Sequence, residues 1–404
     1  MDRSDELLLD ALRCAIRGEP VCWDIQPAAE DLYRAISLAR RHSVLPLFVH
    51  ACSEVFGILP DRELERLRQE ARAITISQAA HTADLLLLMD ELSTRGLRPA
   101  IMKGLICREL YPEPEQRASV DEDLLIAPDD LSAYHEALLD LGAQPVHPET
   151  ALPGADEVSY TIEARGLYIE LHMCLFPADS DAYGDCAALF NGAVGRSVIQ
   201  HIYGRELRTL SPTDHMLFLL CHAYKHLLHG GVGIRQICDI CLFAERYGCK
   251  ISWENVLASC KKIHIDVLSA AMFRIGAQHL GLPAPDVFST IETDELPLLD
   301  DCLTGGLYGA DDIDRLHSST LTLEAVAAGK TGRRRRGALH SLFLPASSLA
   351  GRFPYLQRRP WLLPVAWVQR AWGYAMERGK VDPGRSMQIG AQRIDMLQKY
   401  QVLP

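Results

Sequence analysis

Two aspartates separated by one residue, Asp121 and Asp123, lie in the segment VDEDLLI. If this segment is a strand, alternate side chains point to one face, so the two carboxylates face the same way and Glu122 faces the other way. Two carboxylates so close repel each other unless a cation lies between them. Carboxylates combined with substrate phosphates are ligands that suit Mg²⁺. The spacing therefore predicts a magnesium site on this strand.

A third acid, Glu170, lies in the apolar segment LYIELH. If that segment is a strand beside the first, three carboxylates converge and can hold two metal ions about 3.5–4 Å apart for an in-line displacement at phosphorus. Glu170 could instead accept the proton of the attacking group. His172 is two residues further on and faces the same way, so we expect it to contact the acceptor or a phosphate.

Positive charge for a triphosphate precedes the aspartates. Lys103 and Gly104 stand between a short apolar segment and a predicted helix. A glycine that opens a helix offers free N–H groups at the positive end of the helix dipole. Arg117 adds charge and Ser119 adds a hydroxyl close to the aspartates. We therefore expect these four residues to bind a nucleoside triphosphate, with ATP as the expected donor.

A third group of polar residues, His222, Lys225 and His226, recurs at helical spacing further along the chain. We expect these side chains to face the carboxylates and to contact phosphate or the acceptor; packing between domains is the alternative. A zinc site is a further alternative, built with His229, Cys238 and Cys241. The cysteine pair lies inside a helical pattern, which disfavours zinc.

The elements that must position these residues are short strands and helices between residues 96 and 210. The pattern predicts strands over 97–102, 120–126, 158–164 and 167–175, and helices over 104–111 and 128–142. Helical patterns dominate on both sides. The fold class expected is α+β: a small mixed-sheet domain over 96–210, a helical region over 1–95, and a helical domain over 211–404 that carries a basic and aromatic tail.

Composition limits the function further. The chain has 404 residues and a formal net charge of −12, which argues against a general nucleic-acid binder. Its apolar runs are far shorter than the roughly 20 residues that cross a bilayer, and its first residues form no secretory signal, so we expect a cytoplasmic protein with reduced cysteines. The basic run Arg333–Arg336 is predicted to be a solvated loop.

The string Lys-Gly, Leu-Tyr-Pro and Arg-x-x-x-Asp-x-Asp-Leu-Leu, over residues 103–125, resembles one bacterial branch of the nucleotidyltransferases of the DNA polymerase β type. That branch is the uncharacterised nucleotidyltransferase family, members of which occur in gene clusters for lasso peptides and other modified peptides. The resemblance covers most of residues 96–245 and part of the tail. Most nucleotidyltransferases of this type have Gly-Ser where this chain has Lys103-Gly104.

The resemblance implies Mg²⁺-dependent transfer of a nucleoside monophosphate from a triphosphate to an acceptor, with release of pyrophosphate. It implies that Asp121, Asp123 and Glu170 bind the metal, and it leaves open whether the acceptor is a peptide, a protein or a small molecule. Two alternatives remain. In a catalytically degenerate protein that binds a peptide or protein partner, Lys103 would pair with Asp121 or Asp123. Separately, Glu170 could be a buried acid paired with an arginine such as Arg165. A phosphotransferase is disfavoured because the kinase glycine-rich loop is missing.

Overall fold

The computed structural model describes residues 1–147, 155–307, 312–331, 353, 355–369 and 382–403. The Arg333–Arg336 run lies outside these described residues, as does part of the aromatic tail.

Seven strands of the described residues form one mixed sheet: β1 (Ala100–Met102), β2 (Asp121–Leu125), β3 (Gln144–Pro145), β4 (Glu157–Ile162), β5 (Leu167–His172), β6 (Val198–Ile202) and β7 (Arg205–Thr209). Their order in the sheet is β3-β4-β5-β2-β1-β7-β6. β2 runs antiparallel to β1 and parallel to β5. The strand that carries the paired aspartates is therefore enclosed on both sides.

The two faces of this sheet differ in polarity because strand side chains alternate. On β2, β4 and β5 one face carries Asp121, Asp123, Glu157, Ser159, Glu170 and His172. The opposite face is apolar apart from one acid, and it carries Glu122, Leu124, Val158, Tyr160, Ile162, Ile169 and Leu171. Helix α6 (Leu131–Asp140) packs on the apolar face, where His135 Nδ1 lies 2.8 Å from the hydroxyl of Tyr160. The polar face therefore carries the candidate functional side chains.

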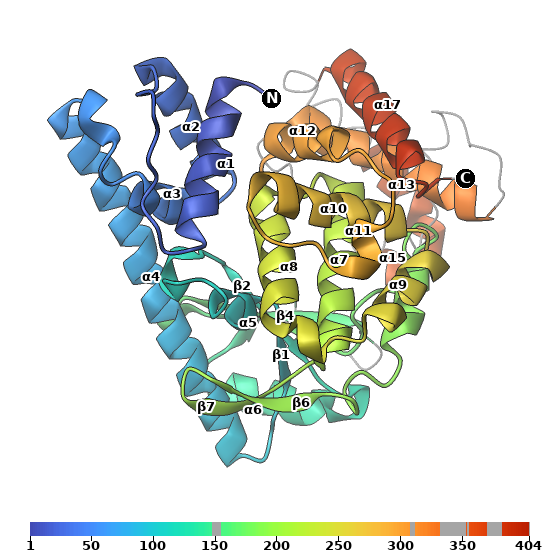
Figure 1. The fold of residues 1–404 in the computed structure, drawn as a ribbon. Coiled ribbons are helices and arrows are strands. Elements are labelled where there is room, and N and C mark those ends of the chain that lie inside the picture. The colour runs from blue at the N-terminus through green and yellow to red at the C-terminus, as the bar shows by residue number, and fades with distance from the viewer. Residues whose placement is uncertain (148–154, 308–311, 332–352, 354, 370–381, 404) are drawn as a thin grey trace.

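Helices precede the sheet, as Figure 1 shows in blue. α1 (Arg3–Ala15), α2 (Ala29–Arg41) and α3 (Leu45–Ala51) pack on one another, and the long helix α4 (Asp61–Thr94) runs from α3 past the sheet. α1 is capped by Asp2, whose side chain accepts a hydrogen bond from the N–H of Asp5 in a capping box. The short helix α5 (Gly104–Arg108) joins β1 to the loop before β2.

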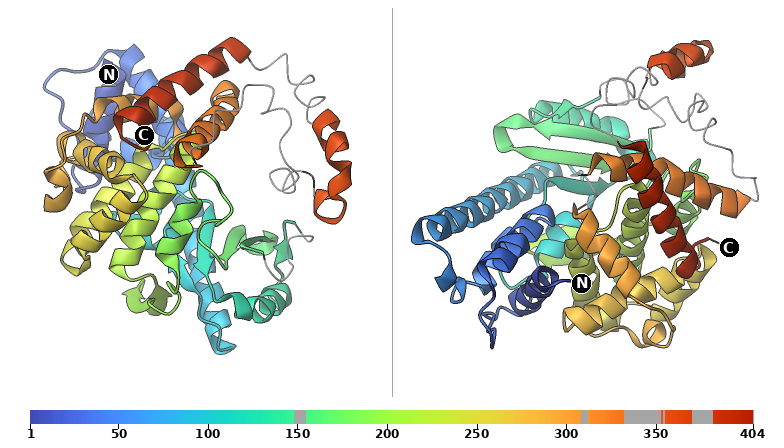
Figure 2. Two further views of the ribbon diagram at one scale, coloured as in Figure 1. Left: turned by 90° about the vertical axis from the view of Figure 1, so that its right-hand side faces the viewer. Right: turned by 90° about the horizontal axis from the view of Figure 1, so that it is seen from above.

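A second group of helices follows the sheet: α7 (Pro212–His229), α8 (Ile234–Tyr247), α9 (Trp253–Lys262), α10 (Asp266–His279), α11 (Asp286–Ser289), α12 (Leu296–Gly305), α13 (Ile313–Thr331), α15 (Tyr355–Arg358) and α17 (Pro383–Lys399). α7 begins as its sequence predicts, with the hydroxyl of Ser211 accepting a hydrogen bond from the N–H of Asp214 at 3.2 Å. α13 and α17 pack against each other, as the two views of Figure 2 show.

The predicted α+β class is confirmed by one seven-stranded mixed sheet between helical regions. The predicted hairpin is present: β4 and β5 pair antiparallel, and Gly166 adopts a left-handed conformation with φ of 61° in the connection. Sequence reasoning missed β3, β6 and β7. β3 has only two residues, β7 is largely polar, and the apolar residues of β6 are interrupted by Gln200 and His201, so no regular apolar strand pattern marks them.

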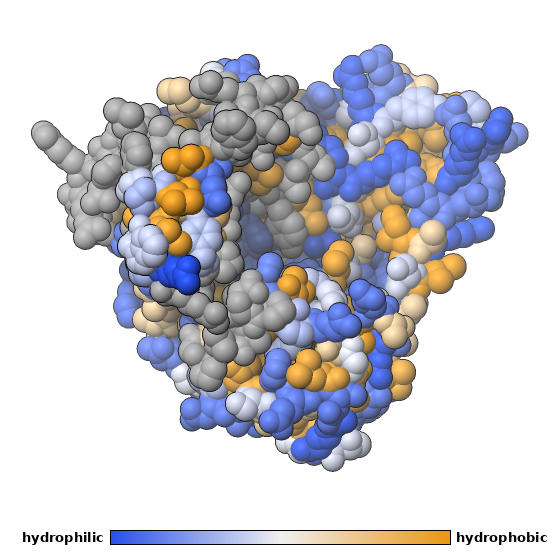
Figure 3. Space-filling view, turned by 180° about the vertical axis from the view of Figure 1, so that it is seen from behind, coloured by the Kyte–Doolittle hydropathy of each residue, from blue (hydrophilic) through white to orange (hydrophobic). Residues whose placement is uncertain are grey.

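The surface in Figure 3 is mostly hydrophilic, and it is hollowed near the centre of the face shown there. Among the described helices, none combines the length and the apolar character that a membrane crossing needs.

Candidate active site

The carboxylates converge because β2 and β5 are parallel neighbours in register. Asp123 lies directly opposite Glu170, and both face the polar side of the sheet with Asp121 and His172. Asp123, Glu170 and His172 each offer one ligand atom, and these atoms lie within 4.8 Å of one another. Asp123 is only 2% exposed, whereas the Glu170 side chain is 25% exposed. The group is therefore buried at Asp123 and partly open to solvent at Glu170.

Lys103 joins the two aspartates. Its Nζ lies 2.9 Å from Asp121 Oδ2 and 3.0 Å from Asp123 Oδ2. Burial, the largest single effect, raises the pKa of each aspartate, but the Lys103 ammonium, joined at Asp123 by the hydrogen bond from His172, holds both pKa values below their usual range. Both carboxylates are therefore ionised. This is the pairing expected of a degenerate protein, and it also shows that the pair attracts a cation.

The backbone of Lys103 is strained, with φ of 45° and ψ of −93°. Such a conformation costs about 1–3 kcal/mol in a residue other than glycine and persists only where neighbours enforce it. The Lys103 N–H donates to His215 Nε2 at 3.1 Å. Burial lowers the pKa of His215 to about 3, so its ring is neutral and can accept. His215 on α7 thus fixes the turn that aims Lys103 at the aspartates.

His172 lies among three carboxylates. Its Nε2 is 3.1 Å from Asp123 Oδ1 and 3.7 Å from Glu170 Oε2, and its Nδ1 is 3.5 Å from Glu157 Oε2. Burial disfavours the charged ring, but hydrogen bonds to Asp123 and Glu170 and the charge of Glu157 raise the pKa of His172 to about 9. Without a metal ion the ring is therefore protonated at neutral pH.

Helix α7 brings a row of histidines to the same place. His222 Nε2 lies 3.5 Å from Lys103 Nζ and 3.0 Å from His226 Nε2. Burial, together with the charge of Lys103, lowers the pKa of both rings, that of His226 to about 3. Both are therefore neutral at physiological pH. Lys225 is partly exposed between them and forms no ion pair within the described part of the chain.

The opposite face of β2 holds a separate buried network. Glu122 is fully buried and pairs with Arg108 at 2.6 Å and with His81 at 3.0 Å. Gly104 touches this network, because a Cβ built on it would lie 2.3 Å from Glu122 Oε2. Close packing on Glu122 thus accounts for the glycine, and the expected contact between Gly104 and a phosphate stays a prediction.

Arg117 and Ser119 have other partners. Arg117 is 1% exposed and donates to both oxygens of Asp239 at 3.1 and 2.6 Å. Ser119 accepts from Arg108 at 2.5 Å. Its N–H donates to Gln78 at 2.6 Å. The structure thus gathers Lys103 with the carboxylates and gives Arg117 and Ser119 partners outside that group.

Two contributors were missed by sequence reasoning. His215 lies seven residues before His222 on α7, which is two helical turns and therefore the same face, so the histidine spacing was a usable signal. Glu157 is opposite His172 across the β4–β5 hairpin. Only the register of that hairpin reveals it, and the register depends on the length of the turn. Arg165, the alternative partner of Glu170, pairs with Glu91 at 2.9 Å instead.

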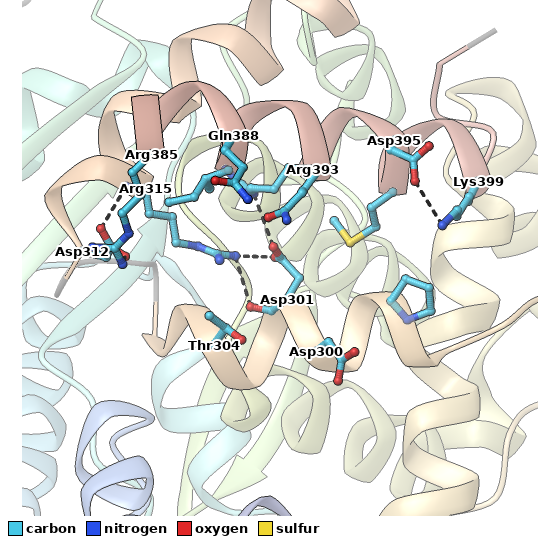
Figure 4. Close-up of a pocket in the computed structure, with 14 residues that line it drawn as sticks. Asp300, Asp301, Thr304, Asp312, Arg315, Arg385, Gln388, Arg393, Asp395 and Lys399 are labelled. Carbon is cyan, nitrogen blue, oxygen red and sulfur yellow. Dashed lines mark hydrogen bonds and ion pairs between the residues drawn. The ribbon is translucent and has the colours of Figure 1, made fainter. Parts of the chain in front are cut away.

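A second cluster of charges lines a cavity of about 530 Å³ between α12, α13 and α17 (Figure 4). Asp301 contacts Arg315 at 2.5 Å and Arg393 at 3.6 Å, and Arg385 pairs with Asp312. Four acids and four bases line this cavity: Asp300, Asp301, Asp312, Asp395, Arg315, Arg385, Arg393 and Lys399. Their charges balance, as expected of contacts that hold helices together.

The polar face of the sheet has the donor set that a divalent cation requires. Asp123 is buried, yet no hydrogen bond from the described residues reaches its Oδ2, which Lys103 contacts only as an ion pair. Carboxylate oxygens and an imidazole nitrogen within ligand distance of one another suit such an ion. The residues present therefore fit a metal.

The comparisons with known proteins agree with this chemistry. No curated protein and no solved structure is similar enough to the chain to count as a match. A family model described as uncharacterised nucleotidyltransferase matches residues 28–281, which is more than half of the chain and includes every residue of the carboxylate group. The chain therefore belongs to the uncharacterised nucleotidyltransferase family, a family of transferases.

Proposed function

We propose that this protein transfers a nucleoside monophosphate from a nucleoside triphosphate to an acceptor and releases pyrophosphate. ATP, entering with Mg²⁺, is the expected donor. The convergence of Asp121, Asp123 and Glu170 on one face of the sheet carries the proposal. Family membership supports it, because the match spans this face and the helix α7 opposite.

The charges around the carboxylates support a triphosphate as the ligand. Lys225 has no ion pair in the described residues and lies close enough to His222 and His226 to lower their pKa values. A phosphate between α7 and the sheet would give Lys225 a partner. Lys103 would move its interaction from the aspartates to the triphosphate as a metal takes its place. Gly104, Arg117 and Ser119 would support the loop that carries Lys103.

Each group would have a distinct task. A metal held by the carboxylates would stabilise the charge that develops on the α-phosphate and the leaving pyrophosphate. Glu170, whose side chain is partly exposed, would accept the proton of the attacking acceptor. His222 and His226 are neutral and would donate hydrogen bonds to phosphate or acceptor without adding charge.

One observation favours a second candidate, a non-catalytic binding protein. The Lys103 ammonium satisfies both aspartates without any nucleotide, as a degenerate site would. Such a protein would bind a peptide or protein partner but would not transfer a nucleotide to it. The experiment must therefore separate binding from transfer.

Calorimetric titration of the full chain with ATP, CTP, GTP and UTP in Mg²⁺ tests nucleotide binding. We expect one of the four to bind, and Asp121→Ala/Asp123→Ala to abolish its binding. The matched control is Asp129→Ala/Asp130→Ala, which removes two exposed acids from the turn before α6. If wild type binds none of the four, the non-catalytic candidate replaces the enzyme.

Labelled nucleotides then identify the group transferred. ATP labelled on the α-phosphorus and ATP labelled on the γ-phosphorus are incubated with the protein and fractionated lysate as the source of acceptor. Label from the α position on a product establishes nucleotidyl transfer. Label from the γ position alone would establish a phosphotransferase and reject the proposal.

A further inference from the structure

The ligand group on the sheet is not all oxygen. His172 directs Nε2 toward Asp123 and Glu170, at 3.1 and 3.7 Å, from the same face of β2 and β5. One nitrogen and two oxygens thus come within 4.8 Å of one another. The sequence pattern predicted instead a set of three carboxylates, in which Asp121 takes the place of His172.

His172 is oriented in the way that metal-binding histidines usually are. Its other nitrogen, Nδ1, lies 3.5 Å from Glu157 Oε2. A histidine that binds a metal almost always donates its second N–H to a carboxylate or carbonyl, which fixes the ring and the free lone pair. Glu157 would keep the proton on Nδ1 and leave Nε2 free for an ion.

Asp121 lies outside the group because a cation already occupies its side. Lys103 Nζ is 2.9 Å from Asp121 and 3.0 Å from Asp123, so it lies between the two carboxylates. That is the position in which a second metal ion would be shared by the same two residues. The strained backbone of Lys103 and its hydrogen bond to His215 hold the ammonium there.

We propose that the protein holds one resident divalent transition-metal ion of the Mn²⁺ class at Asp123, Glu170 and His172, and that the Lys103 ammonium occupies the second metal position until the nucleotide brings Mg²⁺. The inference rests on the proposed function, whose site it describes more closely. Imidazole suits first-row transition metals such as Fe²⁺ and Zn²⁺, and Mn²⁺ accepts it alongside carboxylates, whereas Mg²⁺ prefers oxygen ligands and retains its waters. Mg²⁺ would then arrive only with the nucleotide.

Titration of the full chain with Mn²⁺, without nucleotide, tests the resident ion. The electron paramagnetic resonance signal of free Mn²⁺ measures binding, and Mg²⁺ is added as a competitor. We expect one Mn²⁺ per chain, displaced by Mg²⁺ only at a concentration at least about tenfold higher. Absence of Mn²⁺ binding, or equal competition by Mg²⁺, overturns the proposal.

Three variants distinguish this ligand set from the all-carboxylate set. Glu157→Gln should weaken Mn²⁺ binding about 10–100-fold, because it removes the outer partner of the histidine. His172→Gln should weaken it at least as much, whereas Asp121→Asn should leave it within about threefold. Thermal unfolding of each variant shows that it is folded, and the partly exposed Glu157 is the mildest change. If Asp121→Asn is the most damaging of the three, the ion has the predicted all-carboxylate ligands instead.

Lys103→Met tests the replacement of the second ion. Without the ammonium, Asp121 and Asp123 lose their shared cation and we expect a second, weaker Mn²⁺ to bind, so that the stoichiometry rises from one to two. A stoichiometry that stays at one shows that Lys103 does not occupy a metal position. Because nucleotide is absent throughout, these outcomes stand apart from nucleotidyl transfer: a protein that binds Mn²⁺ as proposed but transfers no nucleotide would reject the proposed function alone.

Discussion

The carboxylate group on the sheet and the charged cavity between α12, α13 and α17 are built from similar residues but differ in charge balance. On the sheet, Asp121, Asp123 and Glu170 surround Lys103 and His172, so each cation has more than one carboxylate. In the cavity the relation is reversed. Asp301 alone pairs with the buried Arg315 and Arg393 through its side chain (Figure 4).

This difference indicates what each cluster is for. Burial lowers the pKa of Arg393 to about 10 although Asp301 opposes that shift, and two of its nitrogens have no hydrogen-bond partner within the described residues. The two buried arginines of the cavity therefore depend on Asp301. The sheet cluster has acids in excess, and carboxylates so close together repel one another unless a further cation binds between them. Removing one acid from the sheet cluster should therefore impair ligand binding, whereas removing one acid from the cavity should impair folding.

The largest effect is expected from Asp123→Asn. Nucleotidyl transfer should fall more than about a thousandfold, because the metal contributes several kcal/mol to the transition state and each 1.36 kcal/mol is tenfold in rate. The fold should persist, because Lys103 retains its ion pair with Asp121 and His172 retains its ion pair with Glu157. Transfer assays measure the loss of activity, and circular dichroism shows whether the variant is folded. An unfolded variant would show that the sheet cluster is structural.

Asp301→Ala should have the opposite profile. It leaves the buried Arg315 and Arg393 without their shared carboxylate, which should lower the free energy of unfolding by about 3–5 kcal/mol. Urea denaturation measures this loss. Nucleotide affinity of the remaining folded protein should equal that of wild type. A loss of nucleotide binding without a loss of stability would assign the cavity a role in ligand binding.

Lys225→Ala should produce a smaller effect, confined to the sheet cluster. Lys225 has no ion pair in the described residues to lose, so stability should change little, while KM for the triphosphate should rise about tenfold through one missing phosphate contact. Steady-state kinetics with Lys225→Arg as the charge-conserving control measure this. An unchanged KM in Lys225→Ala would place the triphosphate away from α7.

Arg385→Ala should have the smallest effect. Its side chain is 59% exposed and pairs with Asp312, so the loss should be no more than about 1 kcal/mol, measured by urea denaturation as for Asp301→Ala. Transfer activity should be unaffected. A loss as large as that of Asp301→Ala would show that the cavity depends on its exposed pairs as much as on its buried ones.

The part of the site that the sequence predicts is the part that depends on strand alternation. Asp121 and Asp123 share a face because strand side chains alternate with a period of two residues. The neighbouring strand β5 then places Glu170 opposite Asp123. Contacts between residues far apart in the sequence could not be predicted. The pairing of Arg117 with Asp239 joins the loop before β2 to α8, and no local pattern reveals it. The fold was predictable in its class and in its acid-bearing strands, but not in β6 and β7, whose order depends on pairing across the sheet.

The opposite orientation of Glu122 and its two neighbours limits how this protein can evolve. Inserting or deleting one residue within β2 exchanges the two faces of the strand, which would bury the aspartates among apolar side chains and turn Glu122 away from Arg108. Both losses would occur in a single mutational step. We therefore expect the length of β2 to vary less among related proteins than the lengths of the loops around the sheet.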